Sequence, residues 1–333
     1  MKIYYISPSL QLNINKFTQL KFLKMKKVVF SASLLMASFG ASAQGFYGDL
    51  SIGYGFGFPN SVLGTSAHTD ATTTGPLFTS AGNVKTEKNL QGTIGAGLNI
   101  TLAPGYMFNE HIGAELGLNY FMGANTLMQE GTSTHTNTTV GWNAIEWNNG
   151  SGYAKSNQFR VIPTIVLSTG ASEKLSGYTK LGLILPVAGS TTITGERVTY
   201  TPQVVNGALA AVPTTIETEE VVKGAFTAGF RGAIGVNFKV ADKISIFGEV
   251  FGSFLNIGRK SSEITKLTRN GVDLLPGMTT AEKQTNYLNE INNTTNSSDT
   301  GAVVDANKPL DVLNPAKTSY NQVGLTVGVK FNF

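Results

Sequence analysis

Few side chains in this 333-residue chain are suited to catalysis or metal binding. The sequence has no cysteine and only three histidines, His68, His111 and His135. Without cysteine there is no disulfide, no thiolate metal site and no thiol nucleophile. Three histidines scattered along the chain are a poor basis for a zinc site. We therefore expect neither a metal nor a cofactor.

Two of the histidines have hydroxyl and carboxylate neighbours of the kind that a hydrolase uses. The neighbours of His68 and His135 are Ser66, Asp70, Glu130 and Ser133. A nucleophile, an imidazole and a carboxylate must share one geometry to act together, and no motif fixes such a geometry here. A hydrolase or acyltransferase that acts through His68 or His135 is therefore an alternative, and we expect a protein that is not an enzyme.

Seven other ionisable residues lie on one face of segments that alternate apolar with polar residues. They are Asp49, Glu115, Arg160, Lys180, Arg231, Glu249 and Lys330. If this face is enclosed, the charges should pair, because an unpaired buried charge costs several kcal/mol. Arg231 and Glu249 lie on the two arms of one hairpin, and Asp49 and Lys330 lie near the ends of the first and last segments. We predict a plug of ion pairs; a charged gate or a solute path is the alternative.

The segments that carry these charges have a period of two, which is typical of β-strands. Apolar residues alternate with Gly, Ser, Thr and Asn in eight segments, at about 46–58, 94–108, 112–120, 159–167, 181–187, 226–238, 244–254 and 323–333. Most are close to the length of about 9–11 residues that a tilted strand needs to cross a bilayer. Phe121, Phe247 and Phe251 fall on the polar face, whereas Gly248 and Gly252 fall on the apolar face. In the segment 244–254, a bulge or a tight interior contact would explain why the alternation is broken.

The connections between the segments alternate short and long. The short ones lie at 109–111, 170–177 and 240–243, and the long ones at about 59–89, 124–155, 190–223 and 257–319. Short turns on one side and long polar loops on the other are typical of a transmembrane barrel. We predict an all-β fold, an eight-stranded antiparallel transmembrane β-barrel with up-and-down topology. Ten strands, with part of 190–223 as an added hairpin, is the alternative.

The apolar face is predicted to contact lipid, because the opposite face is too small and polar to form a soluble core. Aromatic residues near the segment ends support this, since they favour the headgroup region. They would form one girdle of Phe58, Tyr120, Phe159, Phe226, Phe254 and Tyr320, and another of Phe46, Tyr106, Phe108, Phe238, Phe331 and Phe333.

The N-terminal region has the features of a secretory signal. Lys26 and Lys27 precede an apolar run of about a dozen residues, which is followed by the small-residue motif Ala-Ser-Ala at 41–43. We predict a signal peptide over 25–43 with cleavage between Ala43 and Gln44. Residues 1–24 would then be an upstream extension from a misassigned start, and 44–333 the mature barrel domain.

The positive charge of the whole chain comes from this N-terminal region. Residues 1–44 hold six of the 25 basic residues and none of the 21 acidic ones, which leaves 19 against 21 and a net charge of −2. Charged residues are 14% of the chain, against about 25% in ordinary soluble proteins. The composition therefore gives no reason to expect nucleic acid as a partner.

The signal, the eight segments and the last residues, Lys330 to Phe333, together resemble the small outer-membrane β-barrel family typified by OmpA and OmpW. The resemblance implies an outer-membrane location, and it implies that the C-terminal Phe333 is read by the barrel-insertion machinery. Resemblance to OmpW also suggests a narrow channel for small or apolar solutes. Because such a resemblance is architectural, it specifies fold and compartment more strongly than function.

From these observations we expect a non-enzymatic outer-membrane barrel whose loops present a surface for binding or for envelope structure. Its partners would be outer-membrane lipid, the barrel-insertion machinery and an extracellular ligand or protein at the loops. In the last long loop, the pattern Thr279–Glu282 is typical of a helix N-terminus. It predicts a short helix with Tyr287, Leu288 and Ile291 on one face.

Overall fold

Eight antiparallel strands of the protein close on one another to form a ring. The computed structural model describes residues 45–58, 61–73, 83–137, 142–170, 174–205, 208–301, 303–314 and 317–333. The ring strands are β1 (Phe46–Gly57), β4 (Gly97–Met107), β5 (Ile112–Gly123), β7 (Trp142–Ser168), β8 (Leu175–Val205), β10 (Gly229–Ala241), β11 (Ile244–Phe254) and β18 (Gln322–Asn332). Each pairs with the next, and β18 pairs with β1, so the ring has no free edge at these pairings.

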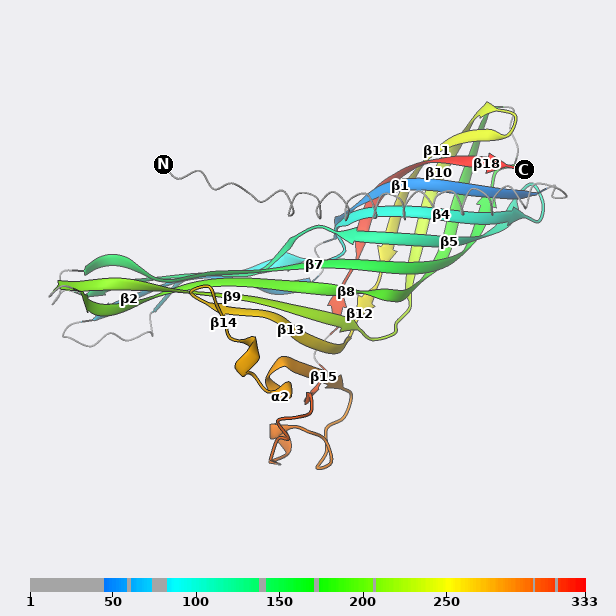
Figure 1. Ribbon diagram of the computed structural model, residues 1–333. Helices are drawn as coiled ribbons and strands as arrows, with labels where there is room; N and C mark the ends of the chain where they lie inside the picture. Colours follow the sequence, from blue (N-terminus) through cyan, green and yellow to red (C-terminus); the bar gives the residue numbers. More distant parts are fainter. Residues whose placement is uncertain are drawn as a thin grey trace, which may run out of the picture.

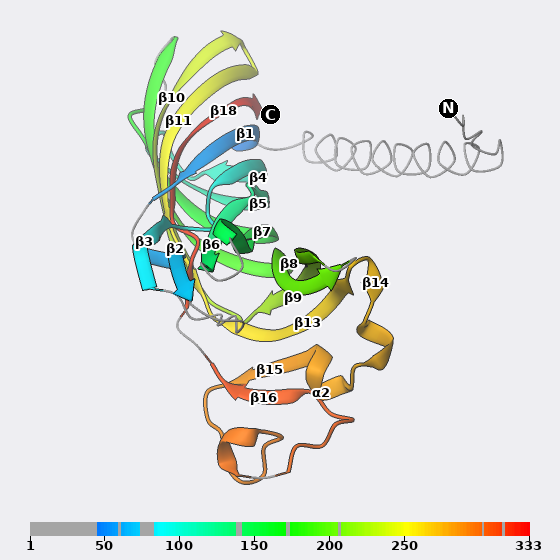
Figure 2. The ribbon, with the colours of Figure 1, turned by 90° about the vertical axis from the view of Figure 1, so that its left-hand side faces the viewer.

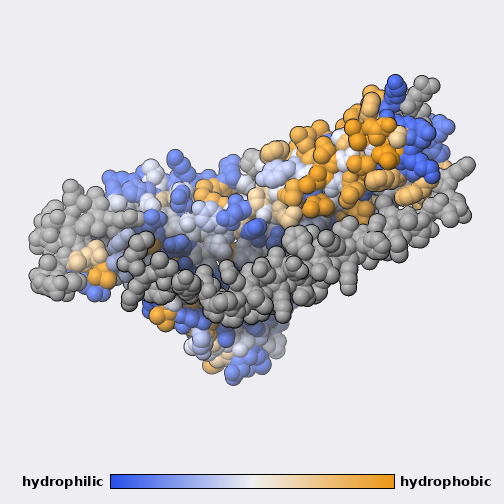
Figure 3. All heavy atoms as spheres, turned by 45° about the horizontal axis from the view of Figure 1, so that its top comes forward, coloured by the Kyte–Doolittle hydropathy of each residue, from blue (hydrophilic) through white to orange (hydrophobic). Residues whose placement is uncertain are grey.

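The alternation in the sequence decides which side chains point out of the ring. Leu50, Ile52 and Tyr54 of β1 are about half exposed, whereas Tyr47 and Asp49 of the same strand are buried. Successive side chains of a strand point to opposite faces, so each strand contributes one apolar outer row and one polar inner row. Figure 3 shows the apolar residues gathered over the ring and hydrophilic residues over much of the rest of the visible surface.

The segments that we expected to be long loops are mostly strands, which corrects the prediction from the sequence. Beyond one end of the ring, β7 and β8 continue as long strands and carry an extended sheet (Figure 1). Its other main strands are β2 (Ser61–Thr73), β3 (Asn83–Gly92), β6 (Thr126–Asn137), β9 (Ala208–Gly224) and β13 (Arg259–Arg269). Here polar residues occur on both faces of the strands, so their sequences lack the regular alternation of the ring strands. Near the ring, Met128, Ala154 and Ile193 pack in an apolar cluster.

The hairpin considered for 190–223 is present, but it does not enlarge the ring. β8 and β9 pair from Thr191 with Val222 to Val205 with Ala208. On its other edge β9 pairs with β13, which leads into the extended sheet. The ring therefore keeps eight strands. Its short connections lie at the end opposite to the extended sheet, which we call the turn end (Figure 1). The other end, which faces the viewer in Figure 2, is the sheet end.

Three short strands lie outside this pattern. β12 (Asn256–Ile257) and β17 (Thr318–Ser319) pair with each other at the sheet end of the ring, and β14 (Val272–Asp273) pairs with β13. A small subdomain below the extended sheet contains β15 (Gln284–Leu288), β16 (Leu310–Leu313), η1 (Leu275–Gly277), α2 (Thr280–Lys283) and η2 (Ser298–Thr300) (Figure 1). The capping box of Thr279 and Glu282 begins α2 as predicted. The helix ends at Lys283, however, and Tyr287 and Leu288 lie in β15, because β15 pairs with both β13 and β16. The expected helical face is therefore wrong.

The aromatic residues of the two expected girdles lie at the two ends of the ring, and all but two are at least one-third exposed. Tyr320 is the clear exception: it is 5% exposed and packs with Ile94 and Leu255 in an apolar cluster at the sheet end. Its assignment to the outer girdle is wrong. Phe333 is half-buried and binds back to β1 through its backbone N–H and the carbonyl of Phe46, at 3.1 Å.

The predicted signal peptide and its cleavage site between Ala43 and Gln44 lie outside the described residues. Within the described part of the chain, no helix has the length and apolar character needed to cross a membrane.

Candidate functional site

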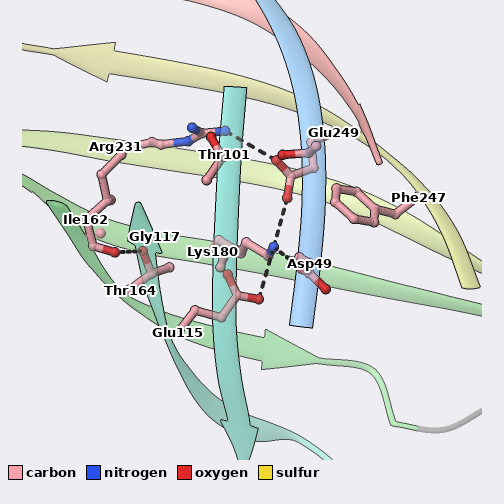
Figure 4. Close-up of a pocket in the computed structure, with 13 residues that line it drawn as sticks. Asp49, Thr101, Glu115, Gly117, Ile162, Thr164, Lys180, Arg231, Phe247 and Glu249 are labelled. Carbon is pink, nitrogen blue, oxygen red and sulfur yellow. Dashed lines mark hydrogen bonds and ion pairs between the residues drawn. The ribbon is translucent and has the colours of Figure 1, made fainter. Parts of the chain in front are cut away.

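Six of the seven predicted ionisable residues meet in one cluster inside the ring, toward the turn end. Lys180 lies at its centre, with its Nζ 2.9 Å from Asp49, 3.0 Å from Glu115 and 3.1 Å from Glu249 (Figure 4). Arg231 pairs with Glu249 at 3.3 Å, and Lys330 lies 3.8 Å from Asp49. We call these six residues the central cluster; it balances three basic groups against three acidic ones.

The two pairs expected from the sequence, Arg231 with Glu249 and Asp49 with Lys330, are both present. The central position of Lys180 was not predicted. It follows from the closure of the ring, which brings β8 opposite β1, β5 and β11 across the interior. No local pattern in the sequence could show this.

Two tyrosines that the sequence analysis missed complete the hydrogen bonding of the cluster. The Tyr47 hydroxyl donates to Glu115 at 2.9 Å, and the Tyr178 hydroxyl donates to Glu249 at 3.1 Å. Both rings also lie against cations, since Lys330 Nζ is 3.9 Å from the Tyr47 ring centre and Lys180 Nζ is 5.1 Å from that of Tyr178. Both tyrosines lie on the polar, inward face of the alternating pattern, and this position in the sequence could have identified them as members of the interior.

The three phenylalanines that broke the alternation are aromatic partners of the interior cations. The guanidinium of Arg160 lies 4.1 Å from the Phe121 ring centre, and that of Arg231 lies 4.4 Å from Phe251. Phe247 is 5.3 Å from Lys180 Nζ. Cations over ring faces are stabilised by the ring quadrupole, more so when both are desolvated. The pairing of β11 with β18 and β10 shows no register shift at Phe247 or Phe251, so a tight interior contact, not a bulge, explains them.

Inward glycines make room for these rings. A Cβ on Gly328 would lie 2.4 Å from the Phe247 ring, and one on Gly235 would lie 2.5 Å from the Tyr178 ring. Real Cβ atoms do not approach so closely. Part of the high glycine content of the chain is therefore explained by the aromatic residues inside the ring.

Arg160 lies apart from the central cluster, nearer the sheet end, and is 1% exposed. Its Nε donates to the Gln158 side chain at 2.8 Å. With its amide oriented to suit the guanidinium, Gln322 accepts from Nη1 at 3.3 Å. Its Nη2 has no hydrogen-bond partner, and within the described ranges no carboxylate pairs with it. Arg160 is therefore a buried cation that amides and one ring stabilise.

The space left around the central cluster is small. The cavity there has a volume of about 40 Å³ and is lined by all members of the central cluster except Lys330, together with Ser51, Thr101 and Thr164. A water molecule takes up about 30 Å³ in the liquid, so the cavity has room for roughly one. Above it, toward the sheet end, Ile162, Ile184 and Leu255 form part of the apolar cluster. Together the two clusters fill most of the space between them inside the ring.

Replacing Arg231 with methionine tests whether the cluster holds the ring together or lines a path. Glu249 would keep its contacts to Lys180 and Tyr178. We therefore expect a lower thermal midpoint. The loss of unfolding free energy should be smaller than the roughly 3–5 kcal/mol that is typical when the remaining charge of a buried pair has no partner left. Ion permeability of the reconstituted protein should stay unchanged. A large new conductance would instead show that Arg231 is a gate.

The histidines of the hydrolase alternative lie in the extended sheet, where β2 and β6 pair in parallel. His68 Nδ1 is 2.9 Å from Thr132 Oγ1, and its Nε2 is 3.2 Å from Asp70. Asp70 also accepts a hydrogen bond from Thr134 and pairs with Lys85 at 3.4 Å, and these two contacts hold the pKa of its carboxyl below its usual range.

The side-chain contacts of His68 are with Thr132 and Asp70, and Ser66, a serine of the hydrolase alternative, makes its hydrogen bond elsewhere. Ser66 donates instead to Glu130 at 3.2 Å. His135 is fully buried, and burial lowers the pKa of its imidazole. His111 lies at the turn end, near the Ser168 carbonyl at 3.2 Å. In the described part of the sequence, no three His, Asp or Glu residues are placed to hold a metal ion together.

Comparison with models of protein families and with characterised proteins gives no match to this chain. Its function must therefore be argued from its own geometry.

Proposed function

We propose that the protein is an integral outer-membrane protein whose ring is an eight-stranded transmembrane β-barrel and whose extended sheet presents a binding or structural surface outside. It is not an enzyme in this proposal. Its partners are membrane lipid, the insertion machinery during assembly, and a ligand or protein at the extended sheet. The C-terminal Phe333 and the secretory signal predicted from the sequence belong to the same proposal.

The observation that carries the proposal is the inverted distribution of polarity around the ring. Charged and amide side chains fill the interior, whereas leucine, isoleucine, valine and phenylalanine side chains stand about half exposed on every ring strand. In water this arrangement would expose one continuous apolar surface around the ring. Contiguous apolar patches on soluble proteins seldom exceed a few hundred Å², so the arrangement is unsuited to water. In a bilayer the same surface contacts hydrocarbon and the closed ring satisfies its backbone hydrogen bonds.

The filled interior supports a barrel that does not conduct along its axis. The central cluster and the apolar cluster lie one above the other within the ring. Moving an ion past them would require breaking several buried ion pairs, which costs several kcal/mol for each charge exposed to a dry interior. The channel alternative would need this interior to rearrange.

The membrane location is tested on the mature chain, refolded in detergent or liposomes. We expect the folded protein to remain in urea-washed membranes and to migrate differently on a gel before and after boiling, because a closed barrel resists unfolding by detergent at room temperature. A chain that is released by urea and shows a single mobility would contradict the proposal.

The same refolded protein allows a test of conduction in a planar bilayer. We expect no stable single-channel steps above background. Stable steps would support the channel for small solutes instead. The hydrolase alternative predicts ester or acyl-transfer turnover that is lost in His68→Ala or His135→Ala; we expect no such turnover.

A further inference from the structure

The wall of the ring is interrupted on one side at the sheet end. β8 pairs with β10 as far as Ile184 and with β9 only from Thr191 onward. Between these two points, residues 185–190 face the connection 225–228, which leads from β9 to β10. A cavity of about 440 Å³ opens at this place, within the range of about 300–1,000 Å³ found for small-molecule sites. We call it the wall opening.

The inner side of the wall opening is a chain of buried hydrogen-bonding groups. Thr191 Oγ1 donates to Ser156 Oγ at 3.1 Å and lies 2.7 Å from the Tyr320 hydroxyl. Gln158 Nε2 also donates to Ser156 Oγ, at 3.1 Å. All four side chains line the opening. The chain ends at Arg160, which binds the Gln158 oxygen at 2.8 Å and has one NH₂ group without a partner.

The outer rim combines apolar surface with positive charge. Val187 is 55% exposed and Phe226 is 81% exposed, both on the outer side of the ring. Lys223 and Lys260 also line the opening, and both are exposed. Asp and Glu are missing from the described lining residues. In contrast to the balanced central cluster, the described lining of this place has two exposed cations and no carboxylate, and a third cation, Arg160, is buried at the inner end of the hydrogen-bond chain.

We propose that the wall opening binds an anionic lipid. Its phosphate or carboxylate lies against Lys223 and Lys260 and the hydrogen-bond chain, and its acyl chain lies over Val187 and Phe226 on the outer face. Hydrogen bonds from ammonium groups to such anions are short and strong. The acyl chain stays in the hydrocarbon of the bilayer and packs against these two side chains, so the headgroup contacts distinguish this lipid from a zwitterionic one. The inference rests on the proposed membrane location, since a lipid reaches the opening from the bilayer.

The test uses the refolded mature protein in nanodiscs of zwitterionic phosphatidylcholine, after the gel-mobility assay has shown that the barrel is folded. A photoreactive dodecyl phosphate is added, and the cross-linked peptides are identified by mass spectrometry. Cross-links are expected within 185–191 and 223–228. The variant Lys223→Gln/Lys260→Gln should weaken retention of dodecyl phosphate by about tenfold. The matched control Lys88→Gln/Lys243→Gln removes two exposed lysines that do not line the opening and should change nothing.

Two competitors separate the headgroup from the chain. Inorganic phosphate should fail to displace dodecyl phosphate, and dodecanol should displace it only weakly. Displacement by inorganic phosphate at equal concentration would reduce the site to a simple anion site. Equal displacement by dodecanol would reduce it to an apolar groove. Either result, or cross-links spread evenly over the outer face, would overturn the inference while leaving the barrel itself established by its gel mobility.

Discussion

Lys180→Met is expected to be the most destabilising single substitution inside the ring. Lys180 is the only cation within 4 Å of Glu115 in the described structure, and it also contacts Asp49 and Glu249. Its removal leaves three acidic groups with only Arg231 and Lys330 to balance them. Breaking a buried ion pair by removing one partner costs about 3–5 kcal/mol. We expect the free energy of unfolding of the refolded protein to fall by at least this amount. It is measured by urea unfolding, with gel mobility as the readout.

A double substitution shows whether uncompensated charge causes this loss. In Lys180→Met/Glu115→Gln, the pairs of Asp49 with Lys330 and of Glu249 with Arg231 remain, so two charges again balance two. The double variant should be more stable than Lys180→Met alone. As an exposed control, Lys266→Met breaks the pair of Lys266 with Glu217 in the extended sheet and should leave the unfolding midpoint unchanged. A double variant weaker than the single one would mean that the cluster acts through packing and not through charge balance.

Val250→Arg is expected to produce the second large effect, because it places a charge on the proposed lipid-facing surface. Val250 is 57% exposed near the middle of β11. An arginine on the lipid face of a barrel near the bilayer midplane costs about 2–4 kcal/mol. The free energy of unfolding measured in liposomes should fall by this amount, and the yield of inserted protein should also fall.

An equally exposed valine outside the ring provides the control. Val84 of β3 is 59% exposed and lies in the extended sheet. Val84→Arg should change stability by no more than about 0.5 kcal/mol, as is usual for substitutions at a surface in water. If Val250→Arg changed stability as little as Val84→Arg, the outer face of the ring would lie in water and the membrane proposal would fail.

The extended sheet marks the limit of what periodicity can predict. In the ring, one face of each strand is apolar, so the pattern in the sequence located all eight strands. In β2, β6 and β9, polar residues occupy both faces. β6 and β9 pair with β7 and β8, which continue beyond the ring, and β2 pairs in turn with β6. Backbone pairing leaves no signature in side-chain polarity. For this reason the sequence pattern predicts loops where these strands lie.

The sequence by itself determined which side chains enter the ring and which stay outside, because a period of two leaves each strand only two choices of face. It also determined the pair of Arg231 with Glu249, since both lie in one hairpin. Only the tertiary structure decided that Lys180 joins three carboxylates from three other strands, that Tyr320 turns inward, and that the wall opens between β8 and β10. These features depend on the stagger between strands and on the point where each strand exchanges one partner for another. Stagger is set by closure of the whole ring, and no single segment of the sequence encodes it.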